Sequence, residues 1–317
     1  MKIAVTGGLG FIGSNYIRYV LHNYPNDTVI NIDKETYASN RAYVKEYEGD
    51  SRYDFKRVDI CSSSEAMKCL SDADAIVNFA AESHVDNSIL DISPFVSTNY
   101  MGTVNLLNIA RERSIRFNQV STDEVFGSLP LNSSIRFTEN TCYNPRNPYS
   151  ATKAAADHTV MAYYNTYSVP ATITHSSNNY GPHQHREKLI PKTILNLNAN
   201  LKVPIYGNGL QIRDWIYVED NCRAIDIVLR HGKAGQRYLI GSGNEMPNVA
   251  LVEKIIELMG KQQDMMEHVN DRPGHDMRYS SDFSKIKREL GWAPKISLNE
   301  GLKLTIGHYL NNLDLYT

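Results

Sequence analysis

Tyr149 and Lys153 are the first residues in this chain whose types and spacing could do chemistry. They stand four positions apart, so on a helix they lie one turn apart on the same face. An ammonium beside a phenol favours the phenolate and lowers a phenol pKa that is otherwise about 10. Such a tyrosine can take the proton from an alcohol as the alcohol carbon loses a hydride. A surface tyrosine and lysine at helical spacing is the simpler interpretation, so the pair needs a second signal.

A glycine turn near the start of the chain supplies that signal. The segment GGLGFIG at 7–13 follows a strand-like run at 2–6 and opens a helix-like run at 11–21. Its glycines let backbone N–H groups approach a pyrophosphate, and the helix N-terminus adds partial positive charge. Asp33 closes the next apolar run, where an acid suits the ribose hydroxyls of NAD and repels the 2′-phosphate of NADP. The turn predicts NAD as cofactor, bound by Gly7, Gly10, Phe11, Ile12, Gly13 and Asp33.

A pair of adjacent carboxyl groups, Asp123 and Glu124, extends the chemistry beyond alcohol oxidation. The pair follows a strand-like run at 116–121, so it should reach the crevice at the carboxyl edge of a parallel sheet. Once C4 of a sugar is a ketone, one carboxylate could remove the C5 proton while the other, protonated, helps the C6 hydroxyl leave as water. Opposite protonation states require different environments for the two groups. A solvated acidic loop is the alternative interpretation.

The elements that must position these residues alternate along the first half of the chain. This alternation predicts an α/β fold, with a parallel sheet covered by helices on both faces. We expect strands at 2–6, 28–32, 54–58, 75–79, 116–121 and 172–174, and helices at 11–21, 94–112 and 148–167.

The pattern loosens beyond about residue 175, where Asn, Pro, Gly, His and Tyr become frequent. We therefore expect residues 1–175 to form the NAD-binding domain. Residues 176–317 should form mainly a smaller lobe over the carboxyl edge of the sheet. The segment 209–240 is expected to return to the main sheet.

Composition excludes several other classes of function. With 33 Lys+Arg against 35 Asp+Glu, the 317 residues carry a formal charge of −2, which gives no argument for nucleic acid or an anionic membrane. No apolar run approaches the length of a membrane span, and no signal peptide fits before the first strand. The four cysteines form no C-x-x-C motif, and the pair His183 and His185 lacks a third ligand, so no metal is predicted. We expect a cytoplasmic protein.

The Tyr149–Lys153 pair after a Gly-x-x-Gly-x-x-Gly turn resembles the extended short-chain dehydrogenase/reductase family, over almost the whole chain. The resemblance implies a Rossmann-like doubly wound parallel sheet with a smaller C-terminal substrate-binding lobe for a nucleotide sugar. It also implies that Tyr149 is the base and Lys153 its pKa modulator. Within the family, Thr122-Asp123-Glu124 is similar to the dTDP-glucose 4,6-dehydratases. That similarity implies that Thr122 binds the sugar O4, Asp123 is the acid and Glu124 the C5 base.

Further segments are similar to the same family, and the resemblance implies a role for each. For the cofactor they are Lys34, Thr36, Asp59, Ile60, Ala80, Ala81, Ser83, Thr98 and Asn179, besides Tyr149 and Lys153. For the substrate they are Ser83, Thr122, Asn178, Lys188, Leu189, Pro204, Tyr206, Arg213, Asn248, Arg272 and His275. The chain departs from the family pattern at Asn87, Phe126 and Leu239, which bears on specificity more than on reaction type.

The implied partners are dTDP-glucose and a second copy of the chain. The helices at 94–112 and 149–167 carry wide apolar faces, and the resemblance implies that they pair in a four-helix bundle in a homodimer. The apolar residues on them include Leu106, Leu107, Ile109, Val160, Met161 and Tyr164. Two alternatives remain: another NAD-dependent dehydratase or epimerase acting on a UDP- or CDP-sugar, and a non-catalytic NAD-binding regulator. Related epimerases typically lack the acidic pair, which favours the dehydratases.

Overall fold

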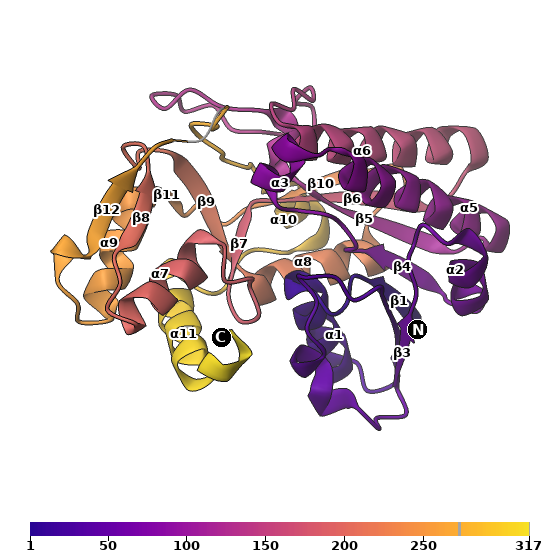
Figure 1. The fold of residues 1–317 in the computed structure, drawn as a ribbon. Coiled ribbons are helices and arrows are strands. Elements are labelled where there is room, and N and C mark those ends of the chain that lie inside the picture. Colours follow the sequence, from indigo (N-terminus) through magenta and orange to yellow (C-terminus); the bar gives the residue numbers. More distant parts are fainter. Residues whose placement is uncertain (272–273, 317) are drawn as a thin grey trace.

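A seven-stranded sheet forms the centre of the computed structural model, which describes residues 1–271 and 274–316 (Figure 1). Its strands are β1 (Lys2–Thr6), β2 (Thr28–Asp33), β3 (Tyr53–Arg57), β4 (Ala75–Asn78), β5 (Arg116–Thr122), β6 (Ala171–Ser176) and β10 (Arg237–Ile240). The order is β10-β6-β5-β4-β1-β2-β3, and all neighbours are parallel. The order reverses between β1 and β4, where open α/β sheets bind ligands. The predicted Rossmann-like doubly wound α/β fold is confirmed.

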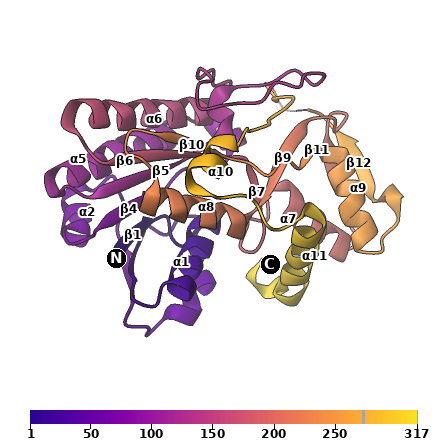
Figure 2. The same ribbon diagram turned by 180° about the vertical axis from the view of Figure 1, so that it is seen from behind.

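Helices cover both faces of this sheet. One face carries α1 (Phe11–Asn23), α8 (Val218–His231) and α10 (Ser284–Leu290), and the other carries α2 (Ser63–Leu70), α5 (Thr103–Arg113) and α6 (Pro148–Tyr167). Successive side chains of a strand point to opposite faces, so Ile3 and Val5 of β1 pack with α1 and α8, whereas Ala4 packs with α2, α5 and α6. Figure 2 shows α8 and α10 in front of the strands.

The helix predicted at 94–112 contains a π-helical segment. It consists of α4 (Ser93–Phe95), the π-helical η2 (Val96–Gly102) and α5. The side chain of Asn99 in η2 accepts from the backbone N–H of Glu82 at 2.9 Å and donates to its carbonyl at 3.0 Å. It also donates to Thr152 Oγ1 of α6 at 3.0 Å. This π segment therefore fixes the loop after β4 against α6, as such segments often do near functional sites.

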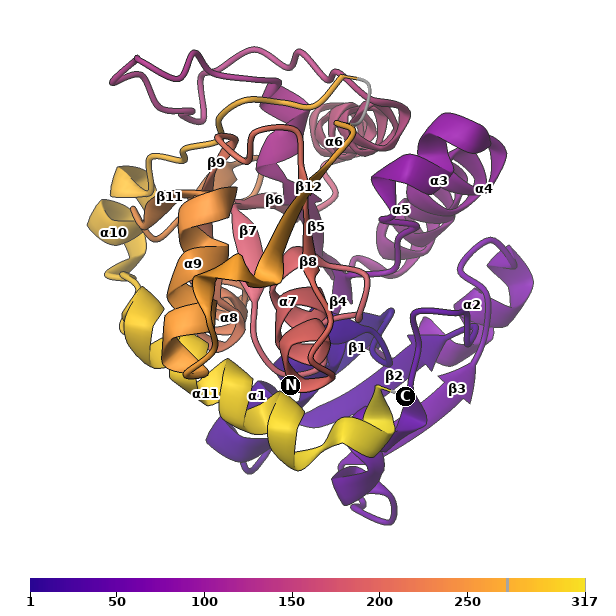
Figure 3. The same ribbon diagram turned by 60° about the vertical axis from the view of Figure 1, so that its left-hand side comes forward.

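The smaller lobe has two sheets of its own. They contain β11 (Glu245–Pro247), β9 (Ile212–Tyr217) and β7 (Asn178–Tyr180), and β12 (Met266–Val269) with β8 (Val203–Tyr206). Figure 3 shows its helices α7 (Leu189–Asn198), α9 (Asn248–Leu258) and α11 (Leu298–Asn311) together. Short elements elsewhere are α3 (Val85–Leu90) and the 3-10 segments η1 (Arg41–Tyr47), η3 (Asp123–Phe126), η4 (Gln263–Met265) and η5 (Leu313–Leu315).

The prediction that 209–240 returns to the main sheet is only partly right. β10 pairs with β6 in the main sheet, and α8 packs beneath it. β9 instead lies between β7 and β11 in the lobe. The reason is visible in its side chains: Trp215 and Tyr217 pack in the core of the lobe, while Ile216 packs in the core under the main sheet. A strand buried on both faces carries no sequence signal for the sheet it joins.

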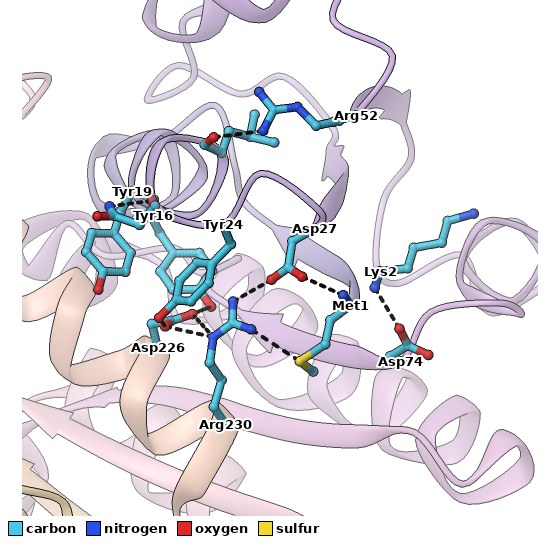
Figure 4. A network of polar contacts seen from close by, with 12 residues as sticks. Met1, Lys2, Tyr16, Tyr19, Tyr24, Asp27, Arg52, Asp74, Asp226 and Arg230 are labelled. Atoms are coloured by element: carbon cyan, nitrogen blue, oxygen red, sulfur yellow. Dashed lines mark hydrogen bonds and ion pairs between the residues drawn. The ribbon is translucent and has the colours of Figure 1, made fainter.

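A polar cluster locks α1 to α8 (Figure 4). Asp226 of α8 accepts from Tyr16 at 3.2 Å and Tyr24 at 2.7 Å, and its carboxylate also pairs with Arg230 Nε. Arg230 reaches Asp27 with Nη2 at 2.7 Å and lies 3.6 Å above the ring of Tyr24. Each buried charge in the cluster is paired, so α1, whose first turn borders the crevice, has a fixed position.

Candidate active site

A cavity of about 410 Å³ opens at the carboxyl edge of the main sheet. Its walls come from the loops after β1, β2, β4, β5 and β6 and from the start of the lobe. The cofactor residues predicted from the sequence line it: Gly7, Gly10, Phe11, Ile12, Gly13, Asp33, Lys34, Thr36, Asp59, Ile60, Ala80, Ala81, Ser83, Thr98, Tyr149, Lys153 and Asn179. Thr122, Asp123, Glu124, Asn178 and Lys188 line the same cavity.

The glycine turn has a backbone that side chains would obstruct. Gly7 has a φ of +69°, and a Cβ there would lie 2.8 Å from backbone atoms of Ala80. A Cβ on Gly13 would lie 2.3 Å from the carbonyl oxygen of Gly7. Gly10 is the N-cap of α1, and no side chain of the described residues caps that helix. The first N–H groups of α1 therefore face the cavity without an internal acceptor, which suits an anionic ligand.

Asp33 is fixed at the end of β2 by three donors. Its carboxylate accepts from the backbone N–H groups of Leu9 at 3.1 Å and Glu35 at 2.8 Å, and from Ser39 Oγ at 2.8 Å. Asp33 lines the cavity although it is only 7% exposed. The geometry agrees with a carboxylate held toward a ligand's hydroxyl groups.

Lys34 closes this end of the cavity. Its ammonium lies 3.5 Å from Asp59 Oδ2 and donates to Thr98 Oγ1 at 3.3 Å. Three residues predicted from separate sequence segments therefore meet at one place.

The end of β5 gives the two carboxyl groups different surroundings. Thr122 Oγ1 accepts from the backbone N–H of Glu124 at 3.3 Å, which starts the turn of η3. Asp123 is 1% exposed, and its Oδ2 has no hydrogen-bond partner among the described residues. Burial raises the pKa of Asp123 well above its usual range, and the charges of Glu124 and Asp214 raise it further. Glu124 is half-buried and accepts from Asn147 Nδ2 at 3.4 Å.

Tyr149 and Lys153 lie one turn apart on α6, as predicted, but their electrostatics differ from the prediction. The helix begins at Asn147, whose side chain accepts from Ser150 N in a capping box. Burial raises the pKa of Tyr149, with Glu124 as the next cause, whereas the sequence predicted a lowered pKa. Burial lowers the pKa of Lys153 to about 8, and its Nζ donates to the carbonyl of Val120 at 2.7 Å. Burial and nearby carboxylates thus outweigh the lysine in this structure.

Several predicted substrate residues lie outside the cavity lining, on the lobe. Leu189 begins α7, Pro204 and Tyr206 lie on β8, and Asn248 begins α9. Arg272 lies outside the described residues. His275 pairs with Asp271 at 2.7 Å.

Arg213 is also outside the lining but is close enough to act on the site. It is 4% exposed, donates to the carbonyl of Asp276 at 2.9 Å and stacks 4.2 Å from the ring of Tyr279. Its charge lowers the pKa of Asp123, against the stronger effect of burial. Arg213 thus connects the lobe to the buried carboxyl group.

Known proteins place these residues in a family. A model of the GDP-mannose 4,6 dehydratase family matches residues 4–305. The chain belongs to this family. It is 46% identical to the dTDP-glucose 4,6-dehydratase of Haemophilus influenzae, over 98% of each chain. It is also 48% identical to the low-salt glycan biosynthesis protein Agl12 of Haloferax volcanii, over 98% of this chain and 99% of that protein.

Solved structures of the dehydratase family have the same fold. The dTDP-glucose 4,6-dehydratase of Streptomyces venezuelae, crystallised with NAD and TYD bound, matches with a TM-score of 0.97 and 43% identity, over 100% of this chain and 99% of that one. A UDP-glucuronic acid 4-epimerase from Bacillus cereus matches with a TM-score of 0.92 at 27% identity, over 98% and 99%. The resemblance to the dTDP-glucose 4,6-dehydratases inferred from the sequence is confirmed.

The structure of this family member also shows a group at the cavity that sequence reasoning missed. Glu187 pairs with His84 Nε2 at 3.0 Å, with His185 Nδ1 at 3.4 Å and with Lys188 at 3.6 Å. His84 follows β4, more than a hundred positions earlier, so no local spacing could reveal the contact. The cluster joins the NAD-binding domain to the lobe across the cavity.

His183, for which the sequence predicts no metal, packs against α1 at the cavity. It has a φ of +72° and stacks on Tyr43 with ring centroids 4.2 Å apart. Its Nδ1 lies 3.0 Å from Ser14 Oγ of α1, and burial lowers its pKa to about 3. A neutral His183 therefore joins the lobe to the first turn of α1.

None of the helices in the described part of the chain is long and apolar enough to cross a membrane.

Proposed function

We propose that this chain is a dTDP-glucose 4,6-dehydratase that works with bound NAD. The observation that carries the proposal is the buried Asp123, whose pKa is raised by burial, beside the half-buried Glu124, in one cavity with Tyr149. The product would be dTDP-4-keto-6-deoxyglucose, formed by oxidation at C4, loss of water across C5–C6 and hydride return to C6. Relatives named dTDP-glucose 4,6-dehydratase, at 43–46% identity over nearly the whole chain, support this substrate.

The cavity fits the proposed cofactor. When bound, NAD accepts the hydride from C4 and later returns it to C6. The free N–H groups of α1 would hold its pyrophosphate, and Asp33 would accept hydrogen bonds from the adenosine ribose. Lys34, Asp59 and Thr98 would surround the adenosine end. Asn179 would contact the cofactor from the start of the lobe.

Tyr149 would take the proton of the C4 hydroxyl, while Thr122 holds O4. Burial raises the pKa of Tyr149, so its phenol must first release its own proton to solvent before the phenolate can accept the C4 proton. It needs a cation nearby when it loses its proton, and Lys153 stands one turn away. With a pKa of about 8, Lys153 is an ammonium at neutral pH and can supply that charge.

Asp123 and Glu124 would divide the elimination between them. Burial raises the pKa of Asp123 and so favours its protonated form, which could give its proton to the departing C6 hydroxyl. The Glu124 carboxylate takes the C5 proton and becomes a carboxylic acid. The C6 hydroxyl leaves as water with the proton of Asp123, which becomes a carboxylate, so the step balances.

The lobe would hold the nucleotide. Ser83, Asn178 and Lys188 line the cavity and can reach the sugar and diphosphate. The guanidinium of Arg213 acts electrostatically on Asp123, and its planar fork suits phosphate oxygens. Leu189, Pro204, Tyr206, Asn248, Arg272 and His275 complete the proposed contacts of the lobe.

We also propose a homodimer built from η2, α5 and α6 as a four-helix bundle. Most of the apolar residues first assigned to that surface instead pack within one chain: Leu106, Leu107, Ile109 and Val160 are at most 1% exposed. Exposed apolar side chains lie nearby at Leu90 (85%), Val96 (40%), Met101 (47%) and Tyr167 (48%). They form the better candidate surface. Light scattering should give twice the 35.8 kDa of one chain, and a mass of one chain would refute the bundle.

A cytoplasmic location is part of the same proposal. The four cysteines, Cys61, Cys69, Cys142 and Cys222, are unpaired thiols, as expected of a reducing compartment.

Product analysis tests the proposed function. The protein is incubated with dTDP-glucose and NAD without a reductant, beside parallel reactions with UDP-, CDP- and GDP-sugars. Mass spectrometry should show a dTDP-sugar that has lost one water, with no net accumulation of reduced cofactor. If only another nucleotide sugar is dehydrated, that sugar is the substrate in place of dTDP-glucose. A product of unchanged mass would indicate an epimerase, and no product at all would favour the NAD-binding regulator.

A further inference from the structure

The buried face of α6 carries a third ionisable residue in register with the proposed catalytic pair. Asp157 lies one helical turn beyond Lys153, as Lys153 lies one turn beyond Tyr149. All three side chains are buried, and Asp157 is 0% exposed. The proposed chemistry gives Asp157 no role, and its side chain is absent from the cavity lining. Burying a carboxylate costs free energy unless it is paired or hydrogen-bonded, so its presence there needs an explanation.

Three elements hold Asp157 in place through one of its oxygens. Oδ2 accepts from Ser121 Oγ of β5 at 2.6 Å and from the hydroxyl of Tyr143 at 3.3 Å. His175 Nε2 of β6 lies 3.1 Å from the same oxygen and 3.0 Å from the Tyr143 hydroxyl. The second oxygen, Oδ1, has no hydrogen-bond partner among the described residues. The carboxylate is therefore well oriented but has no full-strength cation in direct contact.

We propose that Asp157 is a positioning residue for the reaction: it is the fixed counter-charge that keeps Lys153 an ammonium and sets the pH range in which Tyr149 can work. This inference rests on the proposed function, because it concerns the same tyrosine and lysine. It assigns Asp157 no contact with substrate or cofactor. Its influence passes through Lys153, which donates to the carbonyl of Val120.

The electrostatics of α6 support this role. Burial lowers the pKa of Lys153 to about 8, and the charge of Asp157 raises it. Without Asp157, burial would act on the ammonium unopposed. Asp157 also adds to the causes that raise the pKa of Tyr149, after burial, Glu124 and Asp123. One negative charge thus favours the protonated form of both members of the pair.

Other charged groups face the same region and must be considered in a pH experiment. Arg237 of β10 lies 5.2 Å above the ring of Tyr143, so a cation stands behind the hydroxyl that contacts Asp157. The ring of His158, also on α6, lies edge-on to the Tyr143 ring, with the centroids 4.9 Å apart. His175 is the titratable group in direct contact. None of these three contacts the Lys153 ammonium in the described structure, so a change at Asp157 should reach the pair directly.

A purely structural role is the competing explanation. The cluster of Asp157, Ser121, Tyr143 and His175 also ties α6 to β5 and β6, and cutting that tie would lower activity by loosening the helix. Such loosening lowers turnover at every pH. Loss of a counter-charge instead moves the alkaline midpoint of the pH profile, because it changes the proton affinity of the Lys153 amine.

The test compares pH profiles of kcat for the holoenzyme with dTDP-glucose. In Asp157→Asn the alkaline limb, set by loss of the Lys153 ammonium, should move to lower pH by about one unit. The matched control is Tyr143→Phe, which removes one hydrogen bond to the carboxylate and keeps its charge, so its midpoints should stay at the wild-type values. Lower kcat with an unmoved alkaline midpoint in Asp157→Asn would overturn the proposal.

Two further measurements keep the test decisive if Asp157→Asn folds poorly. Asp157→Ser removes the same charge with a smaller side chain, and its alkaline midpoint must move in the same direction. In the wild-type protein, NMR of lysine labelled with carbon-13 at Cε, assigned with Lys153→Met, follows the ammonium itself. Lys153 that is neutral at pH 7 would overturn the proposal even without a folded variant, whereas a charged Lys153 supports it. If the wild type yields no dehydrated product, the proposed function fails, and the NMR titration still decides this inference.

Discussion

The α1–α8 cluster and the end of β5 both bury acidic side chains beside tyrosines, yet they treat the charges differently. Asp226 is paired with Arg230 and accepts from two tyrosine hydroxyls (Figure 4). Asp123 is buried as deeply, but its Oδ2 has no partner among the described residues and its pKa is raised. Breaking a buried ion pair destabilises a fold, whereas an acid with a perturbed pKa in a cavity is a candidate for chemistry. The contrast fits a structural part for Asp226 and the proposed reactive part for Asp123.

The largest effect is expected on turnover, in a variant of the carboxyl pair at the end of β5. Glu124→Gln keeps the shape of the side chain and removes the base, so kcat should fall by about 10²- to 10⁴-fold. Oxidation at C4 should survive, and reduced-nicotinamide absorbance should then appear with a 4-keto sugar that has lost no water. Asp226→Asn is the control, since its carboxylate lies outside the cavity lining. Full turnover in Glu124→Gln would contradict the assigned role.

The second prediction concerns the stability that the α1–α8 cluster gives to the fold. Asp226→Asn removes one of the two buried carboxylates paired with Arg230, and breaking a buried pair costs about 3–5 kcal/mol in the free energy of unfolding. Urea unfolding of the holoenzyme measures the loss, and residual activity in the folded fraction should be close to that of the wild type. A change below about 1 kcal/mol would mean that this pair contributes little, as exposed pairs do.

The smallest predicted effect is a gain in the free energy of unfolding instead of a loss. Asp123→Asn should lose activity but gain about 1 kcal/mol of stability at neutral pH, because it removes a buried acid kept for function. The raised pKa fixes the pH dependence. The folded state holds the proton of Asp123 above the pH at which the unfolded chain releases it, so this acid lowers wild-type stability as pH rises. The advantage of the variant should vanish below about pH 4, where Asp is protonated in both states. An advantage that persists there would have another cause.

The sequence predicted the parts of this molecule that depend on local pattern. The glycine turn, Asp33 at the end of β2 and the Tyr149–Lys153 register lie where spacing put them, because each is fixed within one strand, turn or helix. The strands at 2–6 and 28–32 were found for the same reason.

What escaped prediction depends on contacts between distant segments. The pKa of Tyr149 is raised because tertiary packing buries it beside Glu124, and no spacing reveals burial. β9 could not be assigned to a sheet because both its faces are buried. The pairing of Glu187 with His84 joins two loops that only the fold brings together.

Isotope incorporation tests the central claim most directly. The wild-type protein is incubated with dTDP-glucose and NAD in deuterated water, and the sugar is analysed by mass spectrometry and NMR. On the proposed roles, Glu124 would remove the C5 proton and solvent would return one there, whereas the hydrogen of C4 would pass to C6 through the bound cofactor. The account therefore predicts a product that has lost one water, carries one deuterium at C5 and retains the C4 hydrogen in its methyl group. A dehydrated product without deuterium at C5, or a sugar that keeps its water, would contradict it.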